Sequence, residues 1–168
     1  MAGKILIYGA SGGIGSETAR ILASKGHALH LAGRNGAAID ALCKELNASG
    51  SIGDVLDDEF ISRVSADAGA CMDGLVAAVG SITLNALPRL SRADFLRDYE
   101  LNALSAALAV QGALPALKKS GNASVVLFSS IAANQGFGMH ASIGMAKAAV
   151  NGLMLSLAAE LAPGIRVN

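Results

Sequence analysis

The segment KILIYGASGGIG, residues 4–15, places a short apolar run directly before a cluster of glycines. The run from Lys4 to Tyr8 predicts a strand, and the residues from Gly13 to Lys25 predict a helix. A glycine turn between a strand and a helix lets a pyrophosphate approach the backbone, because no Cβ stands in the way. The N–H groups and the positive dipole end of the helix can then bind the phosphates. We therefore expect a dinucleotide-binding loop made of Gly9, Ser11, Gly12, Gly13, Ile14 and Gly15.

The rest of the chain repeats the alternation of strand and helix. This alternation predicts an α/β fold, a doubly wound parallel sheet of the Rossmann type with helices on both faces in three α/β/α layers. We expect a single domain over residues 1–168, with Pro115 bending the last turn of its longest helix. The sequence stops at the start of the sixth strand, so the C-terminal part of such a fold is expected to be absent. Further strands are predicted at His27–Ala32, Ser51–Ile52, Gly74–Val79, Val125–Phe128 and Ile165–Asn168, and further helices at Gly36–Asn47, Asp57–Ala68, Arg92–Lys118 and Ser142–Leu161.

Composition excludes several classes of function. Thirteen basic and thirteen acidic residues cancel, so no bulk positive field would attract nucleic acid or an anionic membrane. Aromatic residues are only 4% of the chain and Trp is absent, which leaves few surfaces on which bases could stack. Cys43 and Cys71 stand far apart, and no spacing of Cys, His or acidic residues predicts a metal site. We expect a cytoplasmic protein with two reduced thiols, without nucleic-acid or membrane partners.

The end of the second predicted strand indicates which dinucleotide is bound. An acidic residue there would bind the ribose 2′-hydroxyl of NAD, whereas an arginine would accommodate the additional phosphate of NADP. The chain has Gly33-Arg34-Asn35 at this point and no carboxylate until Asp40. A guanidinium makes paired hydrogen bonds to phosphate, so NADP(H) is favoured over NAD(H). The alternative is that Arg34 is a solvated loop charge.

Several motifs together resemble the short-chain dehydrogenase/reductase family. The spacing Gly9-x-x-x-Gly13-x-Gly15 is similar to the coenzyme loop of that family, and Asp54-Val55 resembles its adenine-side position. Asn102 resembles an asparagine in the fourth helix of the family, Ser130 the catalytic serine after the fifth strand, and Lys147 the lysine of its Tyr-x-x-x-Lys pair. The resemblance implies hydride transfer between a nicotinamide coenzyme and a small-molecule carbonyl or alcohol, with Lys147 also binding the nicotinamide ribose.

Two positions depart from the family pattern. The family usually carries Asn-Asn-Ala-Gly after the fourth strand, whereas this chain has Ala77-Ala78-Val79-Gly80; Gly80 is kept as a coenzyme-binding candidate. The tyrosine position, four residues before Lys147, is Ile143. Residues i and i+4 share a helix face, and a neighbouring ammonium would lower the pKa of a phenol there. Isoleucine has no proton to donate, and acid–base catalysis typically contributes about 10²–10⁴-fold in rate.

His140 is the candidate replacement acid, because imidazole is the commonest general acid near neutral pH. The alternative is an ordinary loop histidine. Ser142 is a weaker candidate because a hydroxyl is a poor acid, and Met139 and Met145 are expected to line a pocket or a subunit contact.

The last predicted helix is apolar nearly all round, which is typical of a helix buried on more than one side. The resemblance implies a homodimer or homotetramer through the long fourth and fifth predicted helices, and the alternative is burial within one domain. Three functions remain open on sequence grounds. They are an NADP(H)-dependent oxidoreductase with altered acid catalysis, a non-catalytic NADP(H)-binding sensor or structural partner, and a protein altered deliberately at position 143.

Overall fold

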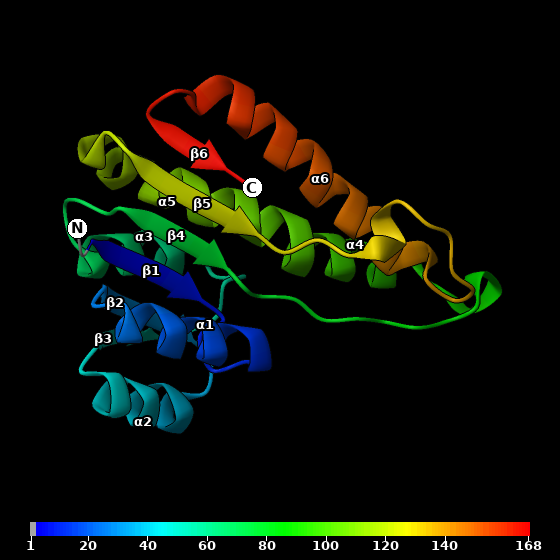
Figure 1. The fold of residues 1–168 in the computed structure, drawn as a ribbon. Helices are drawn as coiled ribbons and strands as arrows, with labels where there is room; N and C mark the ends of the chain where they lie inside the picture. The colour runs from blue at the N-terminus through cyan, green and yellow to red at the C-terminus, as the bar shows by residue number, and fades with distance from the viewer. Residues whose placement is uncertain (1–2) are drawn as a thin grey trace.

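The computed structural model describes residues 3–168, which form a parallel sheet with helices on both faces (Figure 1). The six strands lie in the order β3-β2-β1-β4-β5-β6, and every neighbouring pair is parallel. The doubly wound α/β/α fold is therefore confirmed; residues 1–2 of the expected domain lie outside the described range. The strands are β1 Lys4–Tyr8, β2 Ala28–Gly33, β3 Ser49–Ile52, β4 Gly74–Ala77, β5 Ala123–Leu127 and β6 Ile165–Val167.

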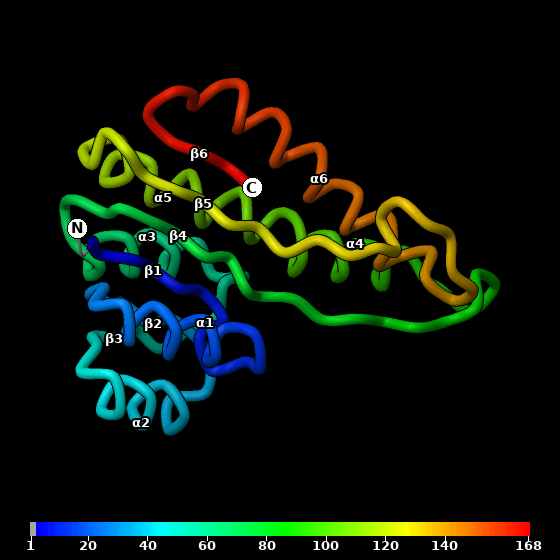
Figure 2. The backbone as a smooth tube through the Cα atoms, in the orientation of Figure 1, coloured from blue at the N-terminus to red at the C-terminus, as the bar shows by residue number. Residues whose placement is uncertain are grey.

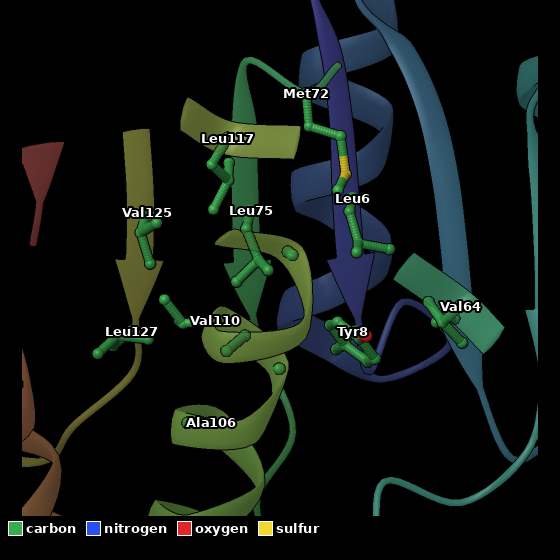
Figure 3. Packing of buried hydrophobic residues seen from close by; sticks show 14 of the residues in the cluster. Leu6, Tyr8, Val64, Met72, Leu75, Ala106, Val110, Leu117, Val125 and Leu127 are labelled. Carbon is green, nitrogen blue, oxygen red and sulfur yellow. The ribbon is translucent and has the colours of Figure 1, made fainter. Parts of the chain in front are cut away.

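Alternating side chains of the strands fill two separate cores. Leu6, Leu75 and Val125 pack on the face covered by α3, α5 and α6, the core shown in Figure 3. Ile7 and Leu31 belong to the second core, on the face covered by α1 and α2. A central strand buried on both faces carries apolar residues at every position, which explains the unbroken apolar run in β1. The helices are α1 Gly13–Ser24, α2 Gly36–Leu46, α3 Asp58–Ala68, α4 Arg92–Tyr99, α5 Ser105–Ser120 and α6 Ala141–Leu161.

The predicted helix at Arg92–Lys118 is wrong in one respect, since it is not a single α-helix. A π-helical turn, η2 at Glu100–Leu104, separates α4 from α5, and Pro115 lies inside α5, which continues to Ser120. Such turns are frequent at functional sites, and η2 contains Asn102 at its centre. Hydrophobic periodicity does not reveal the turn, because eight of the ten residues 101–110 are Leu, Ala or Val and a one-residue shift of the apolar face cannot be read there.

Other boundaries differ by a few residues. The strand predicted at Gly74–Val79 ends at Ala77, and the one at Val125–Phe128 begins and ends earlier, at Ala123–Leu127. The third strand extends back to Ser49. Two short 3₁₀ turns, η1 Leu87–Arg89 and η3 Ile131–Ala133, were not predicted.

Two long loops reach beyond the sheet at its carboxyl edge (Figure 2). One follows β4 and the other follows β5, and they meet where the backbone N–H of Asn85 donates to the carbonyl of Met139, 3.1 Å away. Because β1 lies between β2 and β4, the strand order reverses at the β1–β4 pair. Ligands of doubly wound sheets bind beside such a reversal, at the carboxyl ends of the strands.

The helix α6 runs beside β6 and packs against α4 and η3 (Figure 1). Within residues 3–168 it is buried on one side only, at Ser142, Ile143, Ala146, Val150 and Leu161. Met145 and Leu155 remain 50% and 65% exposed, so residues 3–168 do not cover this helix on all sides. The length and composition of α6 would also allow it to cross a membrane, but a core helix passes the same test, so this is weak evidence.

Candidate active site

The glycine loop between β1 and α1 is held by two close backbone approaches. Gly9 has a φ of 73°, and a Cβ there would lie 2.6 Å from the carbonyl oxygen of Ala78. A Cβ on Gly15 would collide with the carbonyl of Gly9. A Cβ on Gly13, by contrast, would have no neighbour within 4 Å. The fold therefore requires glycine at 9 and 15 but not at 13, where an open approach to the backbone suits a ligand.

The N-terminus of α1 is electrostatically prepared for an anion. Gly12 caps the helix without any side-chain hydrogen bond, and the first turn contains no acidic residue. The helix α3 differs, because Asp57 accepts from the N–H of Glu59 and two acidic residues follow in its first turn. The first N–H groups of α1 have no side-chain cap and coincide with the positive end of the helix dipole, as phosphate binding requires.

A cavity of about 250 Å³ opens beside this loop at the carboxyl ends of β1, β2 and β4. It lies at the reversal of strand order, where a dinucleotide is expected. Of the predicted coenzyme-binding residues, six line the cavity: Gly9, Ser11, Gly12, Arg34, Val55 and Gly80. Gly13, Ile14, Gly15, Asp54 and Lys147 do not line it. Gly15 is buried by the turn itself, and the Ile14 side chain is 57% exposed.

Arg34 lies on the rim of the cavity and is paired with a carboxylate. Its Nη1 lies 3.5 Å from Oδ2 of Asp54, and the two side chains are 69% and 41% exposed. An exposed pair at this distance contributes little free energy, so the guanidinium can exchange this partner for a phosphate. Asp54 is held in place because its Oδ1 accepts from the N–H of Leu56.

Two of the predicted catalytic side chains, those of Asn102 and Lys147, lie together beside Gly80. The Nζ of Lys147, on α6, donates to the carbonyl of Phe128 at 2.8 Å. Asn102 Oδ1, on η2, accepts from the N–H of Ser81 at 3.3 Å. A Cβ on Gly80 would lie 2.8 Å from Asn102 Oδ1 and 3.3 Å from Lys147 Nζ. Burial lowers the pKa of Lys147 because it disfavours the charged ammonium.

Ser130 lies at the carboxyl end of β5 with an exposed side chain. Its Oγ accepts from the N–H of Ala132 at 3.2 Å, and this bond caps η3. The neighbouring Ser129, which sequence analysis did not single out, donates from its Oγ to the carbonyl of Lys147 at 2.9 Å. This bond ties the end of β5 to α6, and no local sequence pattern indicates a contact across eighteen residues.

Position 143 and its surroundings show where a proton donor is missing. The Ile143 side chain is 2% exposed. His140 is the N-cap residue of α6; its Nδ1 lies 2.7 Å from the carbonyl of Gly138, and its ring centroid lies 5.4 Å from that of Phe137. The two tyrosines of the chain are elsewhere, on β1 and α4. Burial raises the pKa of Tyr8 to about 12, and Tyr99 is 39% exposed.

The described part of the chain contains no group of three or more His, Cys, Asp or Glu residues that could hold a metal ion. The polar side chains beside Gly80 are instead the amide of Asn102 and the ammonium of Lys147. Such groups can bind and orient a ribose or a carbonyl oxygen through hydrogen bonds.

This fold and this arrangement of residues belong to a known class of enzymes. The family model described as short chain dehydrogenase matches residues 3–168, and the chain belongs to that family. The family consists of dehydrogenases and reductases that use NAD(P)(H). The chain therefore has the fold of a family of oxidoreductases.

Curated relatives match nearly the whole chain at moderate identity. The 1,2-dihydroxy-1,2-dihydronaphthalene dehydrogenase of Pseudomonas putida is 31% identical over 173 residues, which cover 98% of this chain and 66% of that protein. The cis-4-hydroxycyclohexanecarboxylate dehydrogenase of Sinomonas cyclohexanicum is 33% identical, over 97% of this chain and 69% of that protein. The chain thus spans about two thirds of the length of these relatives.

Solved structures also match nearly the whole chain and about two thirds of their own length. An actinorhodin polyketide ketoreductase variant, solved with NADPH, superposes with a TM-score of 0.94 at 28% identity, over 99% of this chain and 68% of that one. A short-chain dehydrogenase from Streptomyces avermitilis superposes with a TM-score of 0.93 at 30% identity, over 99% of this chain and 64% of that one.

Proposed function

We propose that this protein is an NADP(H)-dependent oxidoreductase that transfers hydride between the nicotinamide and a carbonyl or alcohol substrate. The observation that carries the proposal is the cavity between the glycine loop and Gly80, with Arg34 on its rim and with Asn102 and Lys147 beside Gly80. An uncapped helix N-terminus beside that cavity supports the binding of a pyrophosphate. NADP(H) is preferred to NAD(H) because a guanidinium, and no carboxylate, follows β2 directly.

Each residue of the candidate site has a separate role in the proposed reaction. The bound coenzyme supplies or accepts the hydride. Lys147 is proposed to bind the nicotinamide ribose, and Ser130 to donate a hydrogen bond to the carbonyl oxygen of the substrate. Asn102 holds the loop after β4 through its bond to Ser81. Reduction of a carbonyl also requires a proton on oxygen, and Ile143 cannot provide it. We propose that the proton comes from His140, whose Nε2 is not used in the bond to Gly138, or from solvent.

Exposed apolar side chains on the two loops beyond the sheet favour an apolar substrate. Five large apolar side chains on them are 41–71% exposed: Ile82, Leu84, Ile131, Phe137 and Met139. The names of two relatives specify alcohols on six-membered or fused rings. We therefore propose a ring-borne secondary alcohol or the corresponding ketone as the first substrates to screen.

The exposed apolar side of α6 supports self-association. Met145 and Leu155 project from this helix, and a surface groove of about 310 Å³ runs between α5 and α6. We propose a homodimer or homotetramer that buries both helices, in a cytoplasmic protein.

Replacing Ile143 with Tyr tests the catalytic proposal. The variant is expected to reduce ketones with NADPH about 10²-fold faster than the wild type, since a phenol beside Lys147 restores a general acid. Ile143→Phe is the matched control, because it adds the ring without the hydroxyl, and it should bring no gain.

The second candidate, a non-catalytic NADP(H)-binding protein, is favoured by the absence of a proton donor at position 143. Coenzyme binding by both variants without turnover of any ketone would support that candidate and overturn the enzyme.

A further inference from the structure

A buried carboxylate on α4 is not explained by the proposed function. The Asp98 side chain is 0% exposed, and its Oδ1 accepts from the Oγ1 of Thr83 at 3.0 Å. Its Oδ2 has no hydrogen-bond partner, and no basic side chain in residues 3–168 forms a salt bridge with it. Burying such a group costs free energy, so its presence calls for a compensating role.

The partner of Asp98 belongs to the loop that forms one wall of the coenzyme cavity. Residues 78–86 contain no helix or strand, and Ala78, Val79 and Gly80 line the cavity. Within residues 3–168, four hydrogen bonds attach this loop to segments beyond the adjoining η1 turn. One runs from the N–H of Ala78 to Tyr8 on β1, and one from the N–H of Asn85 to Met139.

The other two attachments are made to one face of the α4–η2 helix. Ser81 donates its N–H to Asn102, and Thr83 donates its hydroxyl to Asp98. Asp98 and Asn102 are four residues apart and are themselves joined, since Asn102 Nδ2 donates to the carbonyl of Asp98 at 3.0 Å. The π turn shifts the backbone pairing here, so that the N–H of Ser105 reaches the carbonyl of Glu100.

We propose that Asp98 is a positioning residue that, with Asn102, fastens the loop after β4 to the helix and so fixes the wall of the coenzyme cavity. The bond at Thr83 lies three residues beyond Gly80, which is in close contact with Asn102 and faces Lys147. Loss of the bond to Asp98 would leave Asn102 as the remaining attachment to this helix and would let Gly80 move relative to Lys147. The inference rests on the proposed coenzyme site.

Two substitutions remove the same bond from opposite ends. Asp98→Ala removes the acceptor, and Thr83→Val removes the donor while it preserves the shape of the side chain. Each is expected to weaken NADPH binding roughly tenfold, the loss that corresponds to one hydrogen bond to a charged group. The double variant should bind no more weakly than either single variant, because the two changes remove one interaction. Asp98→Asn retains the acceptor oxygen and should restore binding to within about twofold of wild type.

Ser105→Ala is the matched control. Ser105 is also buried on this helix, and its Oγ donates to the carbonyl of Leu101 without contact to the loop. It should change thermal stability while leaving NADPH binding as in the wild type. If Asp98→Ala likewise changes thermal stability and leaves NADPH binding unchanged, Asp98 is a structural residue only and the proposal is overturned.

Hydrogen–deuterium exchange separates this proposal from the proposed function. Amides 79–86 should exchange faster in Asp98→Ala and Thr83→Val than in wild type or Ser105→Ala, with no coenzyme present. If the variants exchange faster but the wild type binds no NADPH, the attachment of the loop by Asp98 is supported and the proposed coenzyme site is refuted. Unchanged exchange in both variants would overturn the attachment itself.

Discussion

The coenzyme half and the catalytic half of the candidate site depend on different parts of the protein. The coenzyme half depends on backbone: the close approach of Gly15 to Gly9, the uncapped N-terminus of α1 and the open space at Gly13. The catalytic half depends on the side chains of Asn102, Ser130 and Lys147, and the tyrosine position of the family is occupied by Ile143, which offers no proton. A binding site built from backbone survives many substitutions elsewhere, whereas a reaction can depend on one hydroxyl. Binding and turnover should therefore respond separately to mutation.

The largest effect on binding is expected from Gly15→Ala. The new methyl group would meet the carbonyl of Gly9, so the turn must open. Overpacking of this kind typically costs about 1–3 kcal/mol of unfolding free energy. Chemical denaturation should show this loss, and NADPH binding should disappear with it.

Gly13→Ala sharpens the same comparison. Apart from its chain neighbours and the backbone of its own helix turn, no atom of residues 3–168 lies within 4 Å of the added Cβ, so the free energy of unfolding should change by less than about 0.5 kcal/mol. NADPH should bind roughly tenfold more weakly, because the methyl group stands where the pyrophosphate approaches. Equal binding by Gly13→Ala and wild type would mean that the loop is a structural turn only.

Arg34→Leu tests the coenzyme preference. NADPH binding should weaken about tenfold while NADH binding stays unchanged, since a guanidinium contributes mainly to the 2′-phosphate. Arg97→Leu is the control, because Arg97 is also exposed and is paired with Asp94 at 2.9 Å on α4. An equal loss for both coenzymes, or the same loss in Arg97→Leu, would remove Arg34 from the phosphate site.

The smallest effect concerns His30 on β2, the strand that precedes Arg34. Burial lowers the pKa of His30, the charge of Lys4 lowers it further, and Asp67 opposes both. Both ring nitrogens lie 2.9 Å from serine hydroxyls, those of Ser49 and Ser51. The unfolded chain takes up a proton near pH 6.5, and the folded chain does so only at lower pH. Stability is therefore full above pH 6.5 and decreases on acidification until the folded pKa is passed.

Denaturant unfolding at pH 7.5 and 5.5 measures this effect. The wild type should lose about 0.5–1 kcal/mol more than His30→Asn over this interval, since one pKa unit corresponds to about 1.4 kcal/mol. The same pH dependence in both proteins would show that His30 does not titrate differently on folding.

Much of the fold was predictable because its signals are local. Apolar runs of β1 and β4 mark strands buried on both faces, and the glycines after β1 mark a turn whose backbone contacts require them. The π turn at Glu100–Leu104 was not predictable, since Leu, Ala and Val occupy most positions around it and hide the shift of the apolar face that an inserted residue causes.

Ser130 and Lys147 could be proposed as site residues because their motifs have fixed spacing, and their roles stay predictions. The site was not predictable where contacts join distant residues. Ser129 reaches the backbone of Lys147, and Asp98 reaches Thr83, through bonds that span fifteen or more residues. An acidic residue on a helix predicts a solvated side chain, and only the packed structure shows that Asp98 is buried.

Titration of the purified protein with NADPH and with NADH, followed by coenzyme fluorescence, tests the central claim most directly. The glycine loop and Arg34 predict saturable binding of NADPH that is at least about tenfold tighter than that of NADH. Absence of binding for both coenzymes, or tighter binding of NADH, would contradict the assignment of the cavity to NADP(H).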